Sequence, residues 1–181
     1  TLTKFGAQTG AAITLFDRNN KPVVSIVDGN QVSLKIELSE AVTSDSQVDF
    51  LLAGVDLPVA SCAIPSSGRA CQTASFVTLG WFWNQDGNQQ PQREISARVN
   101  GQQAGGSLNV SVSPRPVVMV HGFNANSHTW DTYLGPQGYL ASVGLLGYAV
   151  GDGQVAGVMD TGSLGDPAAH TNTIAQNAVI L

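Results

Sequence analysis

The segment QVSLKIEL, Gln31–Leu38, decides the fold of the first part of the chain. Its aliphatic residues at positions 32, 34, 36 and 38 alternate with polar or charged residues at positions 31, 33, 35 and 37. Successive side chains of a β-strand point to opposite faces of the sheet. The segment therefore predicts a strand with one buried face and one solvated face.

The same alternation recurs in three later segments of residues 1–113. It is found in QVDFLL (47–52), REISARV (93–99) and SLNVSV (107–112), and turn-forming clusters such as DRNNKP, DGN, PSSG, DGNQQP and NGQQAGG separate the strands. Short strands at regular spacing, without a helical window, predict an antiparallel β-sandwich over residues 1–113. In pattern and length this half resembles the immunoglobulin-like modules of bacterial secreted proteins.

The pattern changes from Pro114 onward. PVVMV (116–120) is a continuous apolar run, typical of a strand buried on both faces of a parallel sheet. Residues 129–147 have mixed helical spacing broken by Gly135, Pro136 and Gly138, and YAV and VAGVMD are short strand candidates. The order of strand and helix predicts the beginning of an α/β domain over residues 114–181, after a linker at SVSPRP (111–116).

A last helix is expected near the end of this half. Asp166 is a suitable N-cap and Pro167 suits the first helical position. Ile174, Ala178 and Leu181 then fall on one helix face.

Composition limits the classes of function. Of 181 residues, 43% are hydrophobic and 12% charged, which indicates a globular protein. The net charge of -5 argues against a nucleic-acid or anionic-membrane partner. No apolar run approaches the roughly 20 residues of a transmembrane helix. Thr1 is not preceded by a leader, so we interpret the chain as processed or trimmed.

Cys62 and Cys71 bracket the turn-rich segment AIPSSGRA. The two could face each other across a hairpin, and a small disulfide loop fits an oxidising compartment, which favours a secreted or otherwise extracytoplasmic protein. Two buried free thiols are the alternative. A metal site is disfavoured because no His or further Cys is nearby in the sequence.

The stretch PVVMVHGFNANSHTW (116–130) resembles the oxyanion-loop segment of lipases and esterases with the α/β-hydrolase fold. The resemblance extends from Arg115 to Leu181. It implies that His121 shapes the loop, that Gly122 allows a close turn, and that the backbone N–H of Phe123 points at the substrate carbonyl. Fixed donors of this kind stabilise a tetrahedral oxyanion by about 3 kcal/mol each. His128 and His170 are expected to be surface or packing residues.

The nucleophile of that family is a serine in a G-x-S-x-G turn, followed in sequence by the acid and the base. TGSLG places Ser163 in a similar phrase. However, the expected helix starts only at Asp166, and Asp166 with His170 would follow too closely to come from later strands. The spacing of strand–helix units puts the serine at or beyond Leu181.

The sequence therefore predicts a truncated part of a secreted carboxylic-ester hydrolase, inactive alone. Its expected partners are a lipid or ester substrate and the remaining C-terminal part of the hydrolase domain, either on the same chain or on a separate one. We expect no cofactor. Ser163 stays open as an alternative nucleophile.

Two other functions are considered. A binding or adhesion module could use GWFWNQDGN as an exposed, carbohydrate-binding platform, because Trp81 and Trp83 would face one way on a strand; alternatively, this triplet fills the core. Calcium could bind Asp17, Asn19 and Asp28, although Asp and Asn in loops are usually turn formers.

Overall fold

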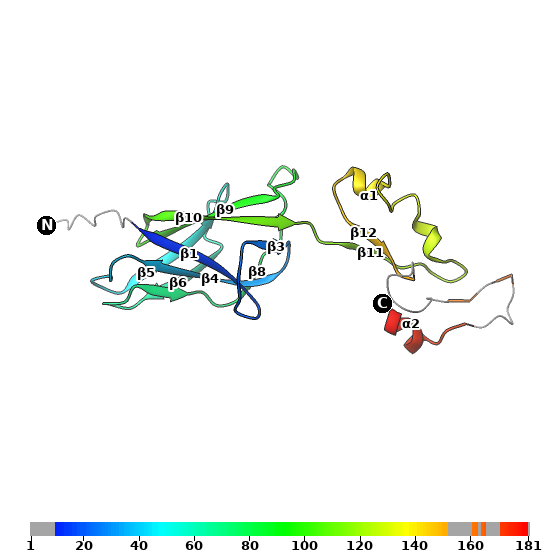
Figure 1. Ribbon diagram of the computed structural model, residues 1–181, viewed down its shortest axis with the longest axis horizontal. Coiled ribbons are helices and arrows are strands. Elements are labelled where there is room, and N and C mark those ends of the chain that lie inside the picture. The colour runs from blue at the N-terminus through cyan, green and yellow to red at the C-terminus, as the bar shows by residue number, and fades with distance from the viewer. Residues whose placement is uncertain (1–9, 152–160, 163, 166–170, 181) are drawn as a thin grey trace. The chain divides into compact units, whose positions relative to one another are not determined.

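The computed structural model describes residues 10–151, 161–162, 164–165 and 171–180. The chain divides into two compact units, Thr1–Ser113 and Pro114–Leu181. The division falls within the Pro-containing segment at which the sequence pattern changes. Figure 1 shows the strands of the first unit and the short strands and helices of the second.

The first unit is an all-β sandwich of two sheets (Figure 1). One sheet has the order β2-β1-β4-β7, with β8 also paired to β4, and the other has the order β3-β10-β9-β5-β6. All pairs are antiparallel except β3 with β10. The first sheet contains β1 (Ala11–Asp17), β2 (Pro22–Val23), β4 (Gln31–Leu38), β7 (Ala70–Gln72) and β8 (Phe76–Val77). The second contains β3 (Ser25–Val27), β5 (Ser46–Leu52), β6 (Ala60–Ile64), β9 (Gln92–Val99) and β10 (Gln102–Ser113).

The core lies between the two sheets and follows the alternation of the sequence. β4 buries its four aliphatic side chains, and Leu34 and Ile36 are fully buried. From the other sheet, Phe50 of β5 and Ile95 of β9 are also fully buried. The polar positions between them remain largely outside, so the strands predicted at 31–38, 47–52, 93–99 and 107–112 are confirmed.

The hairpin between β9 and β10 has a tight turn at Asn100 and Gly101. Both residues have positive φ, 50° and 79°. Two consecutive left-handed residues match the twist of antiparallel strands, and Asn-Gly adopts them most easily. Farther along β10 the register shifts between Gln103 and Ser107, where Gly106 has φ of 95° and a Cβ would meet the Ala11 carbonyl. The bulge thus lets β1 approach β10 closely.

Cys62 and Cys71 are joined by a disulfide, but not across a hairpin. Cys62 lies on β6, which pairs with β5, whereas Cys71 lies on β7, which pairs with β4. The bond therefore links an outer strand of one sheet to an outer strand of the other. The hairpin prediction was wrong because the turn-rich segment between them carries the chain from one sheet to the other.

The second unit contains a two-stranded parallel sheet. β11 (Val117–Met119) pairs with β12 (Gly147–Ala149), with Val118 opposite Tyr148. The connection contains a 3-10 helix, η1 (Ser127–Trp130), and a short α-helix, α1 (Tyr139–Ser142). Parallel neighbours need such a crossover, because a tight turn can join only antiparallel strands.

The apolar run around β11 is less buried than predicted. Val118 is 55% exposed and Val120 is 39% exposed, whereas a strand of a covered parallel sheet would hide both. The reason is that, within the described residues, β11 has β12 as its one paired neighbour. The predicted strand VAGVMD lies outside the described residues.

The last helix begins later than predicted. α2 (Ile174–Ile180) follows three non-helical residues, so it does not continue from Pro167. Thr173 Oγ1 accepts from Gln176 N–H at 3.2 Å, and Gln176 Oε1 accepts from Thr173 N–H at 2.8 Å. This reciprocal capping box fixes the helix start. Asp166, Pro167 and Leu181 lie outside the described residues.

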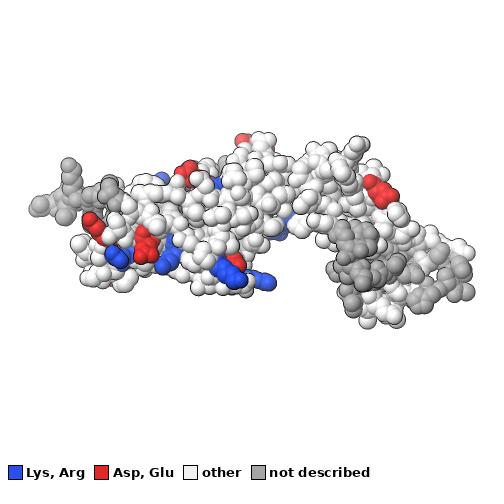
Figure 2. All heavy atoms as spheres, in the orientation of Figure 1, with Lys and Arg blue, Asp and Glu red and all other residues white. Residues whose placement is uncertain are grey.

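Charge is distributed unevenly between the units. On the face in Figure 2, Lys, Arg, Asp and Glu side chains are spread over the first unit, whereas the described part of the second carries only Arg115 and Asp131. Among the described residues, none of the helices is long and apolar enough to cross a bilayer.

Candidate functional site: the His-Gly-Phe loop and a cleft in the sandwich

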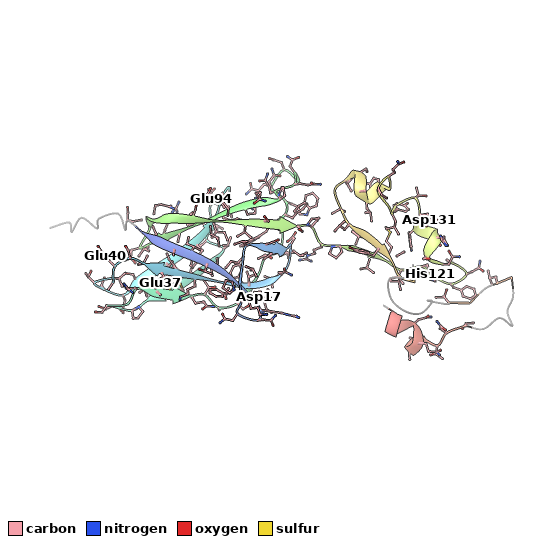
Figure 3. All side chains as sticks on the ribbon, in the orientation of Figure 1. Asp17, Glu37, Glu40, Glu94, His121 and Asp131 are labelled. Carbon is pink, nitrogen blue, oxygen red and sulfur yellow. A yellow bond between two sulfur atoms is a disulfide. The ribbon has the colours of Figure 1, made fainter. Side chains whose placement is uncertain are left out.

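The loop after β11 begins with His121, which is 4% exposed and labelled in Figure 3. Its Nδ1 atom lies 3.2 Å from the carbonyl oxygen of Gly122. Because a carbonyl oxygen can only accept, Nδ1 carries the proton in this contact. The imidazole is therefore engaged by the backbone of its own loop.

The Gly122 carbonyl oxygen also accepts from Thr161 Oγ1 at 2.7 Å. The carbonyl of Gly122 and the N–H of Phe123 belong to one planar trans peptide group, so they point in opposite directions. Two hydrogen bonds to the carbonyl thus fix the direction of the Phe123 N–H. Among the described residues, the Phe123 N–H has no acceptor, and its side chain is 61% exposed.

Gly122 does not need to be glycine for its own conformation. Its φ lies outside the left-handed range, and a Cβ there would meet nothing within 4 Å. Neither the backbone conformation nor crowding among the described residues therefore requires a glycine here. A glycine at position 122 leaves open space beside the Phe123 N–H.

Asn124 joins the loop to the segment 161–165. Its N–H donates to the Gly162 carbonyl at 3.1 Å, and its side-chain oxygen accepts from Leu164 N–H at 3.0 Å. Asn124 itself has φ of 60°, a value that Asn tolerates well. Ser163 lies outside the described residues, but residues on both sides of it are bonded to Asn124.

The other histidines do not join this loop in the described structure. His128 is exposed, and its Nδ1 lies 3.2 Å from Asp131 Oδ2 across η1. Figure 3 labels Asp131 beside that short helix. His170 and Asp166 lie outside the described residues.

The aromatic triplet of the first unit does not form an exposed platform. Trp81 is 5% exposed and Phe82 is 4% exposed, and both belong to the core. They lie in a turn instead of the expected strand, so alternation does not apply to them. Trp83 is partly buried, and its ring meets that of Phe82 edge-on at 5.0 Å between centroids. The alternative interpretation, in which the triplet fills the core, fits the structure.

The proposed calcium ligands have structural partners. Asp17 Oδ1 accepts from the N–H groups of Asn19 and Lys21, both at 2.9 Å, and Asp28 Oδ1 accepts from Gly80 N–H at 2.8 Å. The Asp17 bonds form a turn, whereas the Asp28 bond joins two segments that are 52 positions apart in the sequence. Within the part of the chain that the structure describes, no three His, Cys, Asp or Glu side chains gather into a possible metal site.

Sequence reasoning missed Arg93, which lines a cleft of about 730 Å³ in the sandwich unit. Arg93 is 7% exposed, and its Nε–H is buried without a hydrogen-bond partner among the described residues. Burial lowers the pKa of its guanidinium from the ordinary value. The signal was present in the sequence, because Arg93 occupies the first inward position of the alternation 93, 95, 97 and 99.

Comparisons with known proteins add little to this geometry. No protein-family profile matches the chain, and no curated protein sequence is similar to it. Among solved structures, one similar chain is that of an engineered protein solved by crystallography. The two sequences are 12% identical, and the TM-score between the two structures is 0.26. The match covers 60% of this chain and 21% of that one, so the chain spans about a fifth of its length.

Proposed function

We propose that residues 114–181 are the first part of an α/β-hydrolase domain in a secreted serine ester hydrolase. In this proposal the loop His121–Asn124 stabilises the oxyanion of the reaction. The observation that carries it is the Phe123 N–H, which is fixed in direction by two hydrogen bonds to the Gly122 carbonyl and has no acceptor among the described residues. The loop also follows the carboxyl end of a parallel strand, where α/β proteins bind their ligands.

The chemistry follows from that donor. A serine Oγ attacks the ester carbonyl carbon, and the π electrons of the carbonyl move to its oxygen. A base takes the hydroxyl proton. The Phe123 N–H then donates to the negative oxygen, where a fixed donor is worth about 3 kcal/mol. The open space beside Gly122 would let an acyl group approach that donor.

The attacking serine is proposed to lie beyond Leu181, on the remaining part of the domain. Exposed apolar side chains on the two strands and the last helix support a further layer of structure. Val118 and Tyr148 are 55% and 38% exposed, and Ile174 of α2 is 91% exposed. Further strands beside β11 and β12, with a layer over their faces, would complete a sheet that has only two strands in the described residues.

The proposal of secretion rests on the Cys62–Cys71 disulfide, because structural disulfides persist mainly in oxidising compartments. Lipid or other carboxylic esters are the proposed substrates.

A fluorophosphonate probe tests the assignment, because it labels activated serines covalently. The parent protein should be labelled at a serine downstream of Leu181 and should hydrolyse p-nitrophenyl esters, whereas the 181-residue chain should do neither. Labelling of Ser163 in the 181-residue chain would instead identify TGSLG as the nucleophile turn. Absence of labelling and of hydrolysis in the parent would overturn the ester-hydrolase proposal.

A further inference from the structure

The cleft at one end of the sandwich is built from residues 52–93 of the first unit alone. The end of β5 and the turn after it supply Leu52, Gly54 and Val55, and the segment 79–90 supplies Trp81 and Trp83. Its volume of about 730 Å³ lies within the range of small-molecule sites. The cleft is therefore independent of the His-Gly-Phe loop and of the function proposed for it.

Arg93 is the unusual residue of this cleft. Buried guanidinium groups are normally paired with a carboxylate or with several carbonyl oxygens, because an unpaired buried charge is costly. Among the described residues, the Arg93 side chain forms no ion pair, and its buried Nε–H has no hydrogen-bond partner. Its neighbour Glu94, labelled in Figure 3, is exposed on the opposite face of β9 and cannot neutralise it.

The chemistry around Arg93 restricts what could pair with it. A guanidinium binds a carboxylate through two parallel N–H···O bonds, so a planar carboxylate suits it best. The indole of Trp83 is partly buried and offers a flat apolar surface. Gln85 and Gln90 line the same cleft with amide groups that can bond hydroxyls.

Asp86 adds a restriction on charge. It is exposed and also lines the cleft. A second negative group on the sugar that occupies the cleft would meet this carboxylate, so the cleft favours a sugar residue with one carboxylate and otherwise neutral hydroxyl groups. An acidic sugar has these features: a carboxylate, hydroxyl groups and an apolar ring face that packs on an indole.

We propose that this cleft binds a uronic-acid residue of an acidic saccharide, with Arg93 pairing with the carboxylate and Trp83 packing against the sugar ring. Arg93 then has a binding role that explains why a charge is kept inside the sandwich. Such a site can lower the stability of the free protein, because the buried Nε–H is satisfied only when the ligand is bound.

The test uses the intact 181-residue chain, with trigalacturonate as the probe and a neutral galactose trisaccharide of the same linkage as its control. Calorimetric titration should show binding of trigalacturonate and at least about tenfold weaker binding of the neutral sugar, as expected for the loss of a charge-assisted pair. In 15N-labelled protein the Nε–H signal of Arg93 should shift on addition of trigalacturonate only.

Two variants separate binding from folding. Arg93→Met removes the charge but keeps an apolar stem, and should raise the melting temperature while weakening trigalacturonate binding at least about tenfold. Arg93→Lys keeps the charge but loses the planar fork, and should also bind more weakly. Arg98→Met is the matched control, because Arg98 lies on the exposed face of the same strand and should leave binding unchanged.

Three results would overturn the proposal: equal binding of the two saccharides, no binding of trigalacturonate at millimolar concentration, or equal loss of binding in Arg98→Met. A lower melting temperature of Arg93→Met together with unchanged affinity would assign Arg93 a purely structural role.

Discussion

The Thr161 hydroxyl donates a 2.7 Å hydrogen bond to the Gly122 carbonyl oxygen, across 39 positions of the chain. The peptide group of Gly122 and Phe123 is planar, so this one bond to the carbonyl also orients the Phe123 N–H. A side chain in the segment around TGSLG thereby sets the direction of a backbone donor in the loop after β11. The orientation of the proposed oxyanion donor depends on both segments.

Replacing Thr161 should loosen this loop. Thr161→Val removes the hydroxyl while keeping the shape of the side chain, and a typical net loss for one hydrogen bond is about 1 kcal/mol. We expect amide exchange at Asn124, which donates to Gly162, to become up to about tenfold faster in hydrogen-exchange NMR. Thr161→Ser keeps the hydroxyl and should exchange like the original protein. Equal exchange in all three proteins would show that the bond does not hold the loop.

Substitutions at Gly122 test the proposed function separately from folding. A Cβ at this position meets open space, so Gly122→Ala should leave the thermal stability of the 181-residue chain unchanged within about 0.5 kcal/mol. In the parent protein, Gly122→Val should lower the rate of ester hydrolysis more than Phe123→Ala does, because its side chain occupies the acyl side of the donor. Phe123→Ala keeps the backbone N–H. Parent activity that is insensitive to Gly122→Val would contradict the placement of the substrate at this loop.

The core of the sandwich allows a matched test of burial. Leu34 is fully buried and Leu57 is 75% exposed, so Leu34→Ala and Leu57→Ala remove the same atoms from opposite environments. We expect Leu34→Ala to lower the free energy of unfolding by about 2–5 kcal/mol and Leu57→Ala by less than about 0.5 kcal/mol. Urea denaturation monitored by the near-ultraviolet signal of the tryptophans measures both. Similar values for the two variants would be incompatible with the observed sheet register.

Residues 1–113 should fold without the second unit. The large hydrophobic cluster lies within this range and includes residues of both sheets. Residues 1–113 expressed alone should therefore show a single cooperative unfolding transition. A gradual, non-cooperative melt would mean that the unit depends on contacts outside it.

The disulfide should stabilise this unit. Cys62 and Cys71 are nine positions apart, so the loop is small, and the expected contribution is somewhat below the roughly 3 kcal/mol of a 15-residue loop. The double variant Cys62→Ser, Cys71→Ser should lower the denaturation midpoint, and a reducing agent should then have no further effect. Thiol titration under denaturing, non-reducing conditions should detect no free thiol in the original chain.

The sequence predicted the strands whose side chains alternate regularly, because the alternation is a local property. Gln31–Leu38 is the clearest instance, since its pattern matches β4 in bounds and in the burial of its four aliphatic residues, while Ser33 on the other face is also buried. Contacts between segments that are distant in the sequence could not be predicted in this way. Nothing local shows that Cys62 and Cys71 lie on different sheets, or that the apolar run at Val118 has so few neighbours among the described residues.

The residues of the candidate sites also differ in whether the local sequence could reveal them. His121, Gly122 and Phe123 could be selected from the sequence because they follow an apolar run, whereas Thr161 could not, since its bond spans distant segments. Arg93 was overlooked because a charged residue near the start of a strand is usually solvated. The start of α2 could have been predicted from Thr173 and Gln176, which form a T-x-x-Q capping box.

The position of the Cys62–Cys71 bond also bears on self-association. A sandwich can recruit further strands from other molecules only where backbone N–H and C=O groups are left unpaired along a sheet margin. The disulfide ties β6 and β7 together along one margin, so a foreign strand cannot separate these two without breaking a covalent bond. At the opposite margin, among the described residues, β3 pairs only with residues 111–113 of β10, and β2 pairs only with residues 15 and 16 of β1. The disulfide therefore holds the two sheets together at one margin, whereas at the other margin the outer edges of the longer strands β1 and β10 offer a foreign strand backbone groups to pair with.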